Sequence, residues 1–138
     1  MMPKTYELTV PADVDRLHDV LAFVDDLLEQ HDFPMKAQTQ IDIALEELFV
    51  NIAQYAYPDI TGEATIRVCV SCEYAEISLI DSGIPYDPLA KPDPDITLSA
   101  QERPIGGLGI FMTKKLMDDI SYEYKDGKNI LTIKKCFH

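Results

Sequence analysis

Two hairpin patterns constrain the fold of this chain more than any other feature. Residues 63–71 and 74–80 alternate apolar and polar side chains, and the short connection between them predicts an antiparallel hairpin. A second hairpin is predicted from 120–124 to 130–133, with its turn at the Asp-Gly-containing segment 126–129. Strands joined in this way pair antiparallel, so the chain is expected to build a largely antiparallel sheet.

Helical patterns occupy much of the remaining sequence. Apolar residues recur at helical spacing over 13–31 and again over 36–56, and a third helix is predicted after the glycines at 106–109. An alternating segment at 4–10 adds a further strand. This order predicts an α+β fold: a two-layer sandwich in which a mostly antiparallel sheet of about five strands packs on about three helices.

Length and charge narrow the class of protein. A chain of 138 residues fits a single domain covering 1–138. The net charge of −12 argues against a nucleic-acid surface, which needs a basic patch, and favours partners with basic faces. No apolar run approaches the roughly 20 residues that cross a bilayer, no signal-peptide pattern is visible, and the cysteine count is odd. We therefore expect a cytoplasmic protein without a membrane partner.

Gly106, Gly107 and Gly109 lie at the mouth of an amphipathic helix. Glycines there let the backbone approach a ligand, and the free N–H groups of a helix start attract phosphate. The same glycines also suit a plain turn, so both interpretations stay open from these residues alone. A Rossmann site is excluded because the glycines do not follow the first strand of a βαβ unit. A P-loop is excluded because Ile110 and Phe111 follow Gly109.

Three other features accompany the glycines. Glu47 and Asn51 are four residues apart, so they project from one helix face, which suits either a solvated surface or a site. Asp81 ends a strand two residues before Gly83, which suits either a turn or a ligand site. Residues 84–105 contain five prolines without regular periodicity, and a loop of this length predicts a lid over a ligand.

The order of these motifs resembles that of the Bergerat (GHKL) ATP-binding fold. More narrowly, the chain looks like the bacterial anti-sigma factor serine kinases and their stand-alone ATP-binding relatives, from the first strand to Thr132. The likeness rests on Glu47-x-x-x-Asn51, Asp81-x-Gly83, the proline-rich segment and Gly106-Gly107-x-Gly109. Each motif alone is weak, and their shared order and spacing carry the resemblance.

The resemblance implies a role for each of these residues. Asp81 would accept a hydrogen bond from the adenine amino group, Gly83 would let the purine lie close to the backbone, and Thr132 would support the adenine end. Asn51 would bind Mg²⁺, a cation that prefers oxygen ligands. Glu47 would act as the general base that takes a proton from the incoming hydroxyl.

The lid and the glycines would hold the phosphates. By resemblance, Gly106, Gly107, Leu108 and Gly109 form the rear hinge of an ATP lid at about 84–105, and their backbone N–H groups face the phosphates. Arg103, at the end of the lid, would be the nearest cation for the terminal phosphate.

The resemblance implies an ATP-binding anti-sigma regulatory factor with serine/threonine protein kinase activity that uses ATP and Mg²⁺. It would phosphorylate an anti-sigma-factor antagonist and sequester a sigma factor, and a homodimer is plausible in this family. An ATP-gated protein-binding switch without phosphoryl transfer is the alternative. Tyr55, where some kinases of the group have histidine, leaves the kinase rate open. A detached histidine-kinase domain is disfavoured because a single helix precedes the Glu47 helix.

Overall fold

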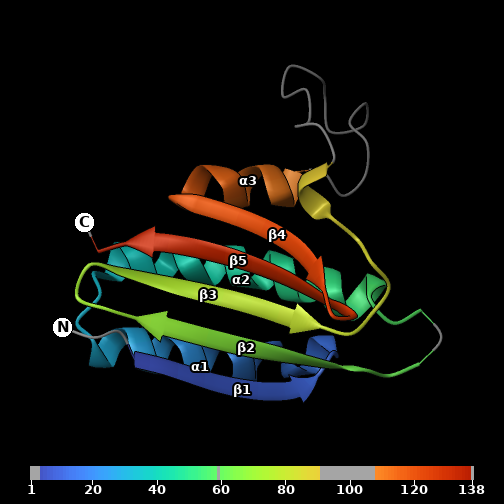
Figure 1. Cartoon of the computed structure of the whole chain (residues 1–138). Helices are drawn as coiled ribbons and strands as arrows, with labels where there is room; N and C mark the ends of the chain where they lie inside the picture. Colours follow the sequence, from blue (N-terminus) through green and yellow to red (C-terminus); the bar gives the residue numbers. More distant parts are fainter. Residues whose placement is uncertain (1–3, 59, 91–107, 138) are drawn as a thin grey trace.

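The computed structural model describes residues 4–58, 60–90 and 108–137. These residues form a five-stranded antiparallel sheet in the order β1-β2-β3-β5-β4. The strands are β1 (Lys4–Pro11), β2 (Glu63–Val70), β3 (Tyr74–Asp81), β4 (Asp119–Lys125) and β5 (Lys128–Cys136). The predicted antiparallel sheet of five strands is confirmed, and β3 and β5 lie side by side near its middle (Figure 1).

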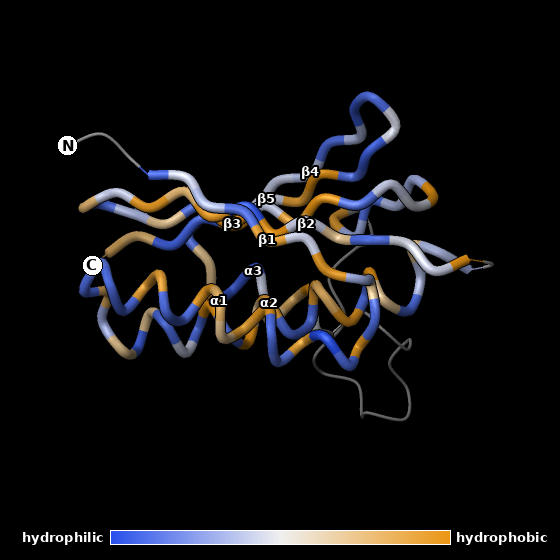
Figure 2. Tube along the Cα trace, turned by 90° about the horizontal axis from the view of Figure 1, so that it is seen from below, coloured by the Kyte–Doolittle hydropathy of each residue, from blue (hydrophilic) through white to orange (hydrophobic). Residues whose placement is uncertain are grey.

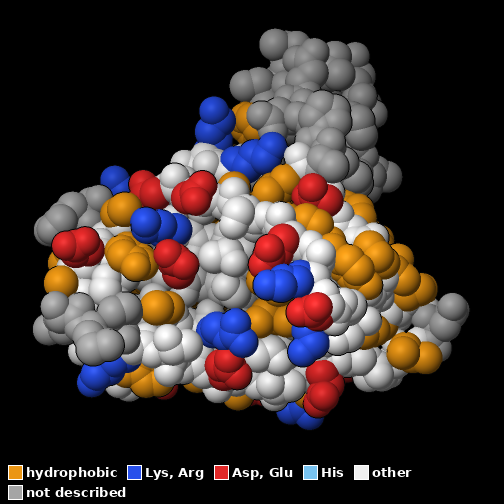
Figure 3. Space-filling model, in the orientation of Figure 1, with side chains coloured by type: hydrophobic (Ala, Val, Ile, Leu, Met, Phe, Trp, Pro, Cys, Tyr) orange, Lys and Arg blue, Asp and Glu red, His pale blue; other side chains and the backbone are white. Residues whose placement is uncertain are grey.

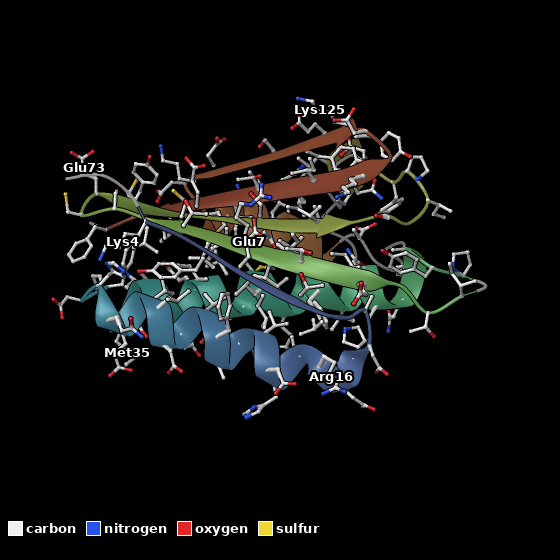
Figure 4. The ribbon with its side chains drawn as sticks, turned by 60° about the horizontal axis from the view of Figure 1, so that its bottom comes forward. Lys4, Glu7, Arg16, Met35, Glu73 and Lys125 are labelled. Carbon is white, nitrogen blue, oxygen red and sulfur yellow. The ribbon has the colours of Figure 1, made fainter. Side chains whose placement is uncertain are left out.

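The helices of the described residues all cover one face of this sheet (Figure 2). They are α1 (Leu17–Gln30), α2 (Met35–Tyr55) and α3 (Leu108–Leu116), with the short 3-10 turns η1 (Val14–Arg16) and η2 (Pro88–Ala90). Arg16 and Met35 lie at opposite ends of the helix layer, so α1 and α2 run antiparallel (Figure 4). None of the helices in the described part of the chain is long and apolar enough to span a membrane. The predicted two-layer α+β sandwich is confirmed.

Buried apolar side chains of the helices and the sheet form one core cluster, and hydrophobic residues are marked in both layers in Figure 2. Strand residues alternate in burial because successive side chains point to opposite faces of the sheet. The largest fully buried side chains come from α1, α2, β2, β3 and β5, and they include Phe49, Leu28, Ile41, Leu45, Leu48, Ile66, Ile77, Leu79 and Ile133. Burying each one contributes about 1.5–3 kcal/mol, so this layer of contacts holds α2 against β3. The opposite sheet face carries mixed charges (Figure 3).

The β4–β5 hairpin turns over two residues. Asp126 has φ 54° and Gly127 has φ 77°, and a two-residue turn with positive φ at both positions matches the twist of the paired strands. The predicted turn at 126–129 is therefore too long, because Lys128 and Asn129 already belong to β5. The strand predicted at 130–133 is also longer than expected at both ends, because β5 covers Lys128–Cys136. This correction places Asn129 inside the sheet.

A carboxyl pair lies between α1 and α2. Asp25 and Asp42 each have a buried Oδ1 atom that no donor among the described residues reaches. Burial, followed by the neighbouring Asp25 carboxyl, raises the pKa of Asp42 from its usual 3.8 to about 8. A proton shared by the two groups supplies the missing donor, as expected for carboxyls that cannot both ionise at close range. Because its pKa is raised to about 8, Asp42 stays largely protonated at neutral pH.

This pair is expected to make folding stability depend on pH. Because the pKa of Asp42 is higher in the folded chain than in the unfolded chain, the native state binds more protons between pH 3.8 and about 8. The contribution of Asp42 to the free energy of unfolding is present in full below pH 3.8 and is lost as pH rises through about 8. Asp42→Asn is expected to be more stable than the wild type in mild alkali and to flatten this profile. Urea unfolding across that range measures the effect.

Asp26→Asn is the matched control because Asp26 is an exposed acid on α1, next to Asp25 in sequence. It is expected to keep the wild-type slope of stability against pH. Equal slopes for wild type and Asp42→Asn would contradict the shared proton.

Candidate functional site

The site is built where β3 ends and the chain turns away from the sheet. Asp81 is the last residue of β3, and its side chain is buried on the same face as Leu79. Its Oδ1 accepts hydrogen bonds from the Gly83 N–H and from Asn129 Nδ2, each at 2.9 Å. The first of these bonds closes an Asx turn, which was one of the two interpretations of this segment. No donor in the described part of the chain reaches Oδ2, so one carboxylate oxygen is left for a ligand.

Asn129 lies directly opposite Asp81 in the β3–β5 register and is buried. Its Nδ2 also donates to the carbonyl of Ile84 at 2.9 Å. Its Oδ1 accepts from the Tyr86 N–H at 3.2 Å and from the Tyr122 hydroxyl. All four bonds of the side-chain amide are thus made within the protein. The amide joins the end of β3 to the loop that follows it.

Sequence reasoning missed Asn129 because Asp-Gly-Lys-Asn is typical of a turn. One signal was present: Asn129 has the same parity as Leu131 and Ile133, which face the core in an alternating strand. A polar residue at such a position needs a hydrogen-bonding partner. Tyr122 supplies one, and burial raises the pKa of its hydroxyl, so the phenol stays neutral and donates.

Helix α2 forms the second wall of the site. Asn51 is half-buried, and its amide has no hydrogen-bond partner within the described ranges. Glu47 lies one turn earlier and is also half-buried. A methyl group added to Gly109 would lie 1.9 Å from Glu47 Cδ, so the absence of a side chain there lets the carboxylate lie against the first turn of α3. The structure therefore brings Glu47 and Gly109 together.

A pocket lies between α2, the end of β3 and the β4–β5 hairpin. Its space, including the open mouth, is about 450 Å³. The walls are mainly apolar or aromatic, and the lining residues are Leu48, Asn51, Ile52, Tyr55, Ala56, Leu79, Asp81, Ile84, Tyr86, Pro88, Tyr122, Asn129 and Leu131. Hydrophobic side chains gather on the surface at this end of the sheet (Figure 3). The pocket therefore places apolar walls beside the Asp81 carboxylate.

Gly83 packs against the end of α2. A methyl group at this position would lie 2.2 Å from the carbonyl oxygen of Ala56 and 2.6 Å from its Cβ. The Ile84 N–H donates to the same carbonyl at 3.0 Å, so the backbone here has little room to move. The glycine therefore has a packing role besides the predicted approach of a purine.

Gly83→Ala is expected to lower the free energy of unfolding by about 1–3 kcal/mol, because the new methyl group meets backbone atoms rather than a flexible side chain. Ser82→Ala is the control, since Ser82 is the exposed neighbour. Urea unfolding of both variants measures the difference. If Gly83→Ala were as stable as Ser82→Ala, α2 and the loop after β3 could move apart without lowering the free energy of unfolding, which would contradict the prediction.

Thr132 does not reach the pocket. It alternates with the buried Leu131 and Ile133, and its hydroxyl hydrogen bonds to that of Ser78 at 2.8 Å on the sheet face away from the helices. This placement corrects the expectation that Thr132 supports the adenine end. Asn129 is the β5 residue paired with Asp81, and Thr132 lies three residues further along the strand. Side chains an odd number of residues apart point to opposite faces of the sheet, so Thr132 points away from the pocket.

The remaining predicted residues are placed only in part. Arg103, Gly106 and Gly107 lie outside the described residues, as does the predicted lid beyond position 90. Leu108 is the first residue of α3, and Gly109 follows it.

Known proteins share both the sequence pattern and the fold. The family described as histidine kinase-like ATPase domain matches residues 10–135. A serine-protein kinase RsbW from Bacillus mycoides (strain KBAB4) is 27% identical over 132 residues, which cover 93% of this chain and 82% of that protein. The RsbW of Bacillus cereus (strain B4264) is 28% identical with the same coverage. A crystal structure of the RsbU and RsbW domains of a Mycobacterium tuberculosis protein matches with TM-score 0.68 and 16% identity, over 96% of this chain and 32% of that chain.

The structure has a five-stranded antiparallel sheet that helices cover on one face, and a pocket lies at the end of an inner strand. This is the α+β architecture of the Bergerat-type ATPases. The match over 10–135 agrees with this class. The chain belongs to the histidine kinase-like ATPase domain family.

Proposed function

We propose that this chain is an ATP-dependent serine protein kinase of the anti-sigma-factor type. The observation that carries the proposal is the buried Asp81 carboxylate, which faces an apolar pocket with one oxygen free of donors from the described residues. Asp81 Oδ2 is not among the fully buried atoms that lack a partner in the described residues, so it is open to accept a charge-assisted hydrogen bond from a ligand in the pocket. A flat heterocycle with an amino group supplies both the apolar surface and the donor.

Adenine meets these requirements better than guanine. Its exocyclic amine donates to Asp81 while its rings contact the apolar walls of the pocket. Guanine carries a carbonyl oxygen at the same ring position, and two facing acceptors cost about 1–3 kcal/mol. The pocket is therefore expected to prefer ATP over GTP.

Residues of α2 fit the reacting end of the nucleotide. Asn51 suits Mg²⁺ because its amide oxygen has no partner in the described part of the chain, and this ion needs few protein oxygens besides phosphate and water. The ion, when bound, offsets the charge that develops on the phosphates. Glu47, one turn away, is the general base for the hydroxyl that attacks the terminal phosphate.

The lid completes the proposed site. Residues 84–105 are the ATP lid of a single ATPase domain over 1–138, and Gly106, Gly107, Leu108 and Gly109 are its rear hinge. The N-terminus of α3, which starts at Leu108, favours phosphate through its free N–H groups. Arg103 is the proposed cation for the terminal phosphate.

The relatives named serine-protein kinase RsbW support phosphoryl transfer to serine. The proposed substrate is an anti-sigma-factor antagonist protein, and the proposed sequestered partner is a sigma factor, so the chain would regulate transcription. The net charge of −12 favours partners with basic faces. A homodimer is part of the same proposal.

Incubation with Mg-ATP and an antagonist protein tests the function. Phosphoserine is expected on the antagonist with ATP, and about 5- to 150-fold less with GTP at the same subsaturating concentration. ATP binding without any label on an antagonist that demonstrably binds the chain would replace the kinase by an ATP-gated switch. A chain that binds no ATP would contradict both functions.

A further inference from the structure

Asn129 has a side-chain amide whose orientation is set by its partners. The Ile84 carbonyl can only accept a hydrogen bond, and the Tyr86 N–H can only donate one. Nδ2 must therefore face Ile84 and Asp81, and Oδ1 must face Tyr86 and Tyr122. Because the amide is buried and fully bonded, it has no hydrogen bond left to offer a nucleotide.

The partners of this amide lie on different parts of the pocket. Asp81 supplies the buried carboxylate, whereas Ile84 and Tyr86 belong to the loop after β3, and all three line the pocket. Asn129 donates to Asp81 Oδ1, which holds that oxygen towards β5 and leaves Oδ2 without a donor in the described part of the chain. The Asn129 side chain thus links the Asp81 carboxylate, the proposed acceptor for the base, to the 84–86 loop, which lines the pocket.

We propose that Asn129 is a positioning residue for purine selection, which holds the Asp81 carboxylate and the 84–86 loop in the arrangement that binds an aminopurine. The inference rests on the proposed ATP site and adds a residue that acts through Asp81 without touching the nucleotide. Tyr122 extends the network because its hydroxyl donates to Asn129 Oδ1 and so maintains the amide orientation. The base pocket is organised before binding, which lowers the cost of ordering it.

Aspartate is the most informative replacement for Asn129 because the two side chains have nearly the same shape. Asn129→Asp puts a second carboxyl oxygen near the place of Nδ2, which lies 2.9 Å from Asp81 Oδ1. Two carboxyl groups this close share one proton and lose it only at raised pH. The protonated form has one O–H, which can donate to Asp81 but leaves the Ile84 carbonyl without its donor, and the doubly ionised form repels Asp81. ATP affinity should therefore weaken as pH rises.

Other titratable groups surround this position. Tyr122 and Tyr124 come from β4, Tyr86 and Asp87 from the loop, and Tyr55 from α2. Tyrosines ionise far above neutral pH, and burial raises the pKa of Tyr122 further. Asp87 is exposed and is present in the wild type as well, so it does not distinguish the variants from wild type.

Calorimetry with Mg-ATP between about pH 5.5 and about pH 8.5 tests the proposal, with each variant compared with wild type at the same pH. The affinity of Asn129→Asp is expected to be about three- to tenfold weaker than wild type at the acid end, where the Ile84 carbonyl has lost its donor, and at least about a further tenfold weaker at the alkaline end. Tyr122→Phe is expected to be about three- to tenfold weaker at every pH. Tyr124→Phe, the same change at an exposed position of β4, should leave affinity unchanged.

A role in stability alone would lower the urea midpoint without giving ATP affinity a new pH profile. A folded Asn129→Asp protein with the wild-type profile overturns the inference. If that variant does not fold, Tyr122→Phe decides, and wild-type ATP affinity in it overturns the inference equally. Failure of the wild type to bind ATP is a different result, because it rejects the proposed function itself.

Discussion

Glu47→Gln is expected to lower the rate of phosphoryl transfer about 10²–10⁴-fold, the usual contribution of a general base. The amide keeps the shape of the carboxylate but cannot take the proton of the attacking hydroxyl. ATP affinity should change little, because Glu47 does not line the base pocket and lies against Gly109 at the start of α3. Single-turnover labelling of the antagonist, combined with calorimetry for ATP, separates the two effects.

Glu46→Gln is the matched control for this experiment, since Glu46 is the exposed acid immediately before Glu47 on α2. It should retain the wild-type rate of labelling. A Glu47→Gln protein that transfers phosphate at the wild-type rate would remove Glu47 from the proposed mechanism and leave Asn51 and the α3 terminus as the contributors.

Asp81→Asn is expected to weaken ATP binding about tenfold to a hundredfold. The Gly83 N–H and Asn129 Nδ2 both donate to the present carboxylate, so the new amide must turn its oxygen towards them. Its NH₂ group then faces the adenine amine, and two donors oppose each other where a hydrogen bond is proposed. The fold should survive because the side-chain shape is unchanged. Calorimetry with ATP and urea unfolding provide the two measurements.

Asp126→Asn controls for loss of one negative charge. Asp126 is exposed in the β4–β5 turn at φ 54°, a conformation that asparagine tolerates well. Its ATP affinity should match that of wild type. If Asp81→Asn binds ATP as tightly as this control, the base does not bind at the end of β3, and the pocket serves another ligand.

Much of the fold could be predicted because it depends on neighbours in the chain. The hairpin was expected at 63–71 and 74–80, and the structure has it at Glu63–Val70 and Tyr74–Asp81. The prediction succeeded because the alternation of apolar and polar residues shows which face of a strand is buried. The Asp-Gly pair correctly marked the second hairpin, whose turn is tighter than expected. The place of Asp81 at the end of a strand was also visible, because the apolar run stops there.

The base site was predicted less completely. Thr132 was expected at the adenine end from its likeness to a family threonine, but it lies on the sheet face opposite to the pocket. Asn129 was assigned to a turn, although it is the residue paired with Asp81. A shift of three positions along a strand changes the face of every side chain, so a small error in register removes the correct residue from the site.

The amino-acid sequence by itself determined the two layers, both hairpins and the acid at the end of β3, because periodicity and turn chemistry act over a few residues. Only the tertiary structure decided which side chains share the pocket. Asn129 meets Asp81 across 48 positions of sequence, and Gly109 of α3 accommodates Glu47 of α2. The β3–β5 register and the packing of α3 against α2 follow from burial of the whole core, because no tight turn joins these elements.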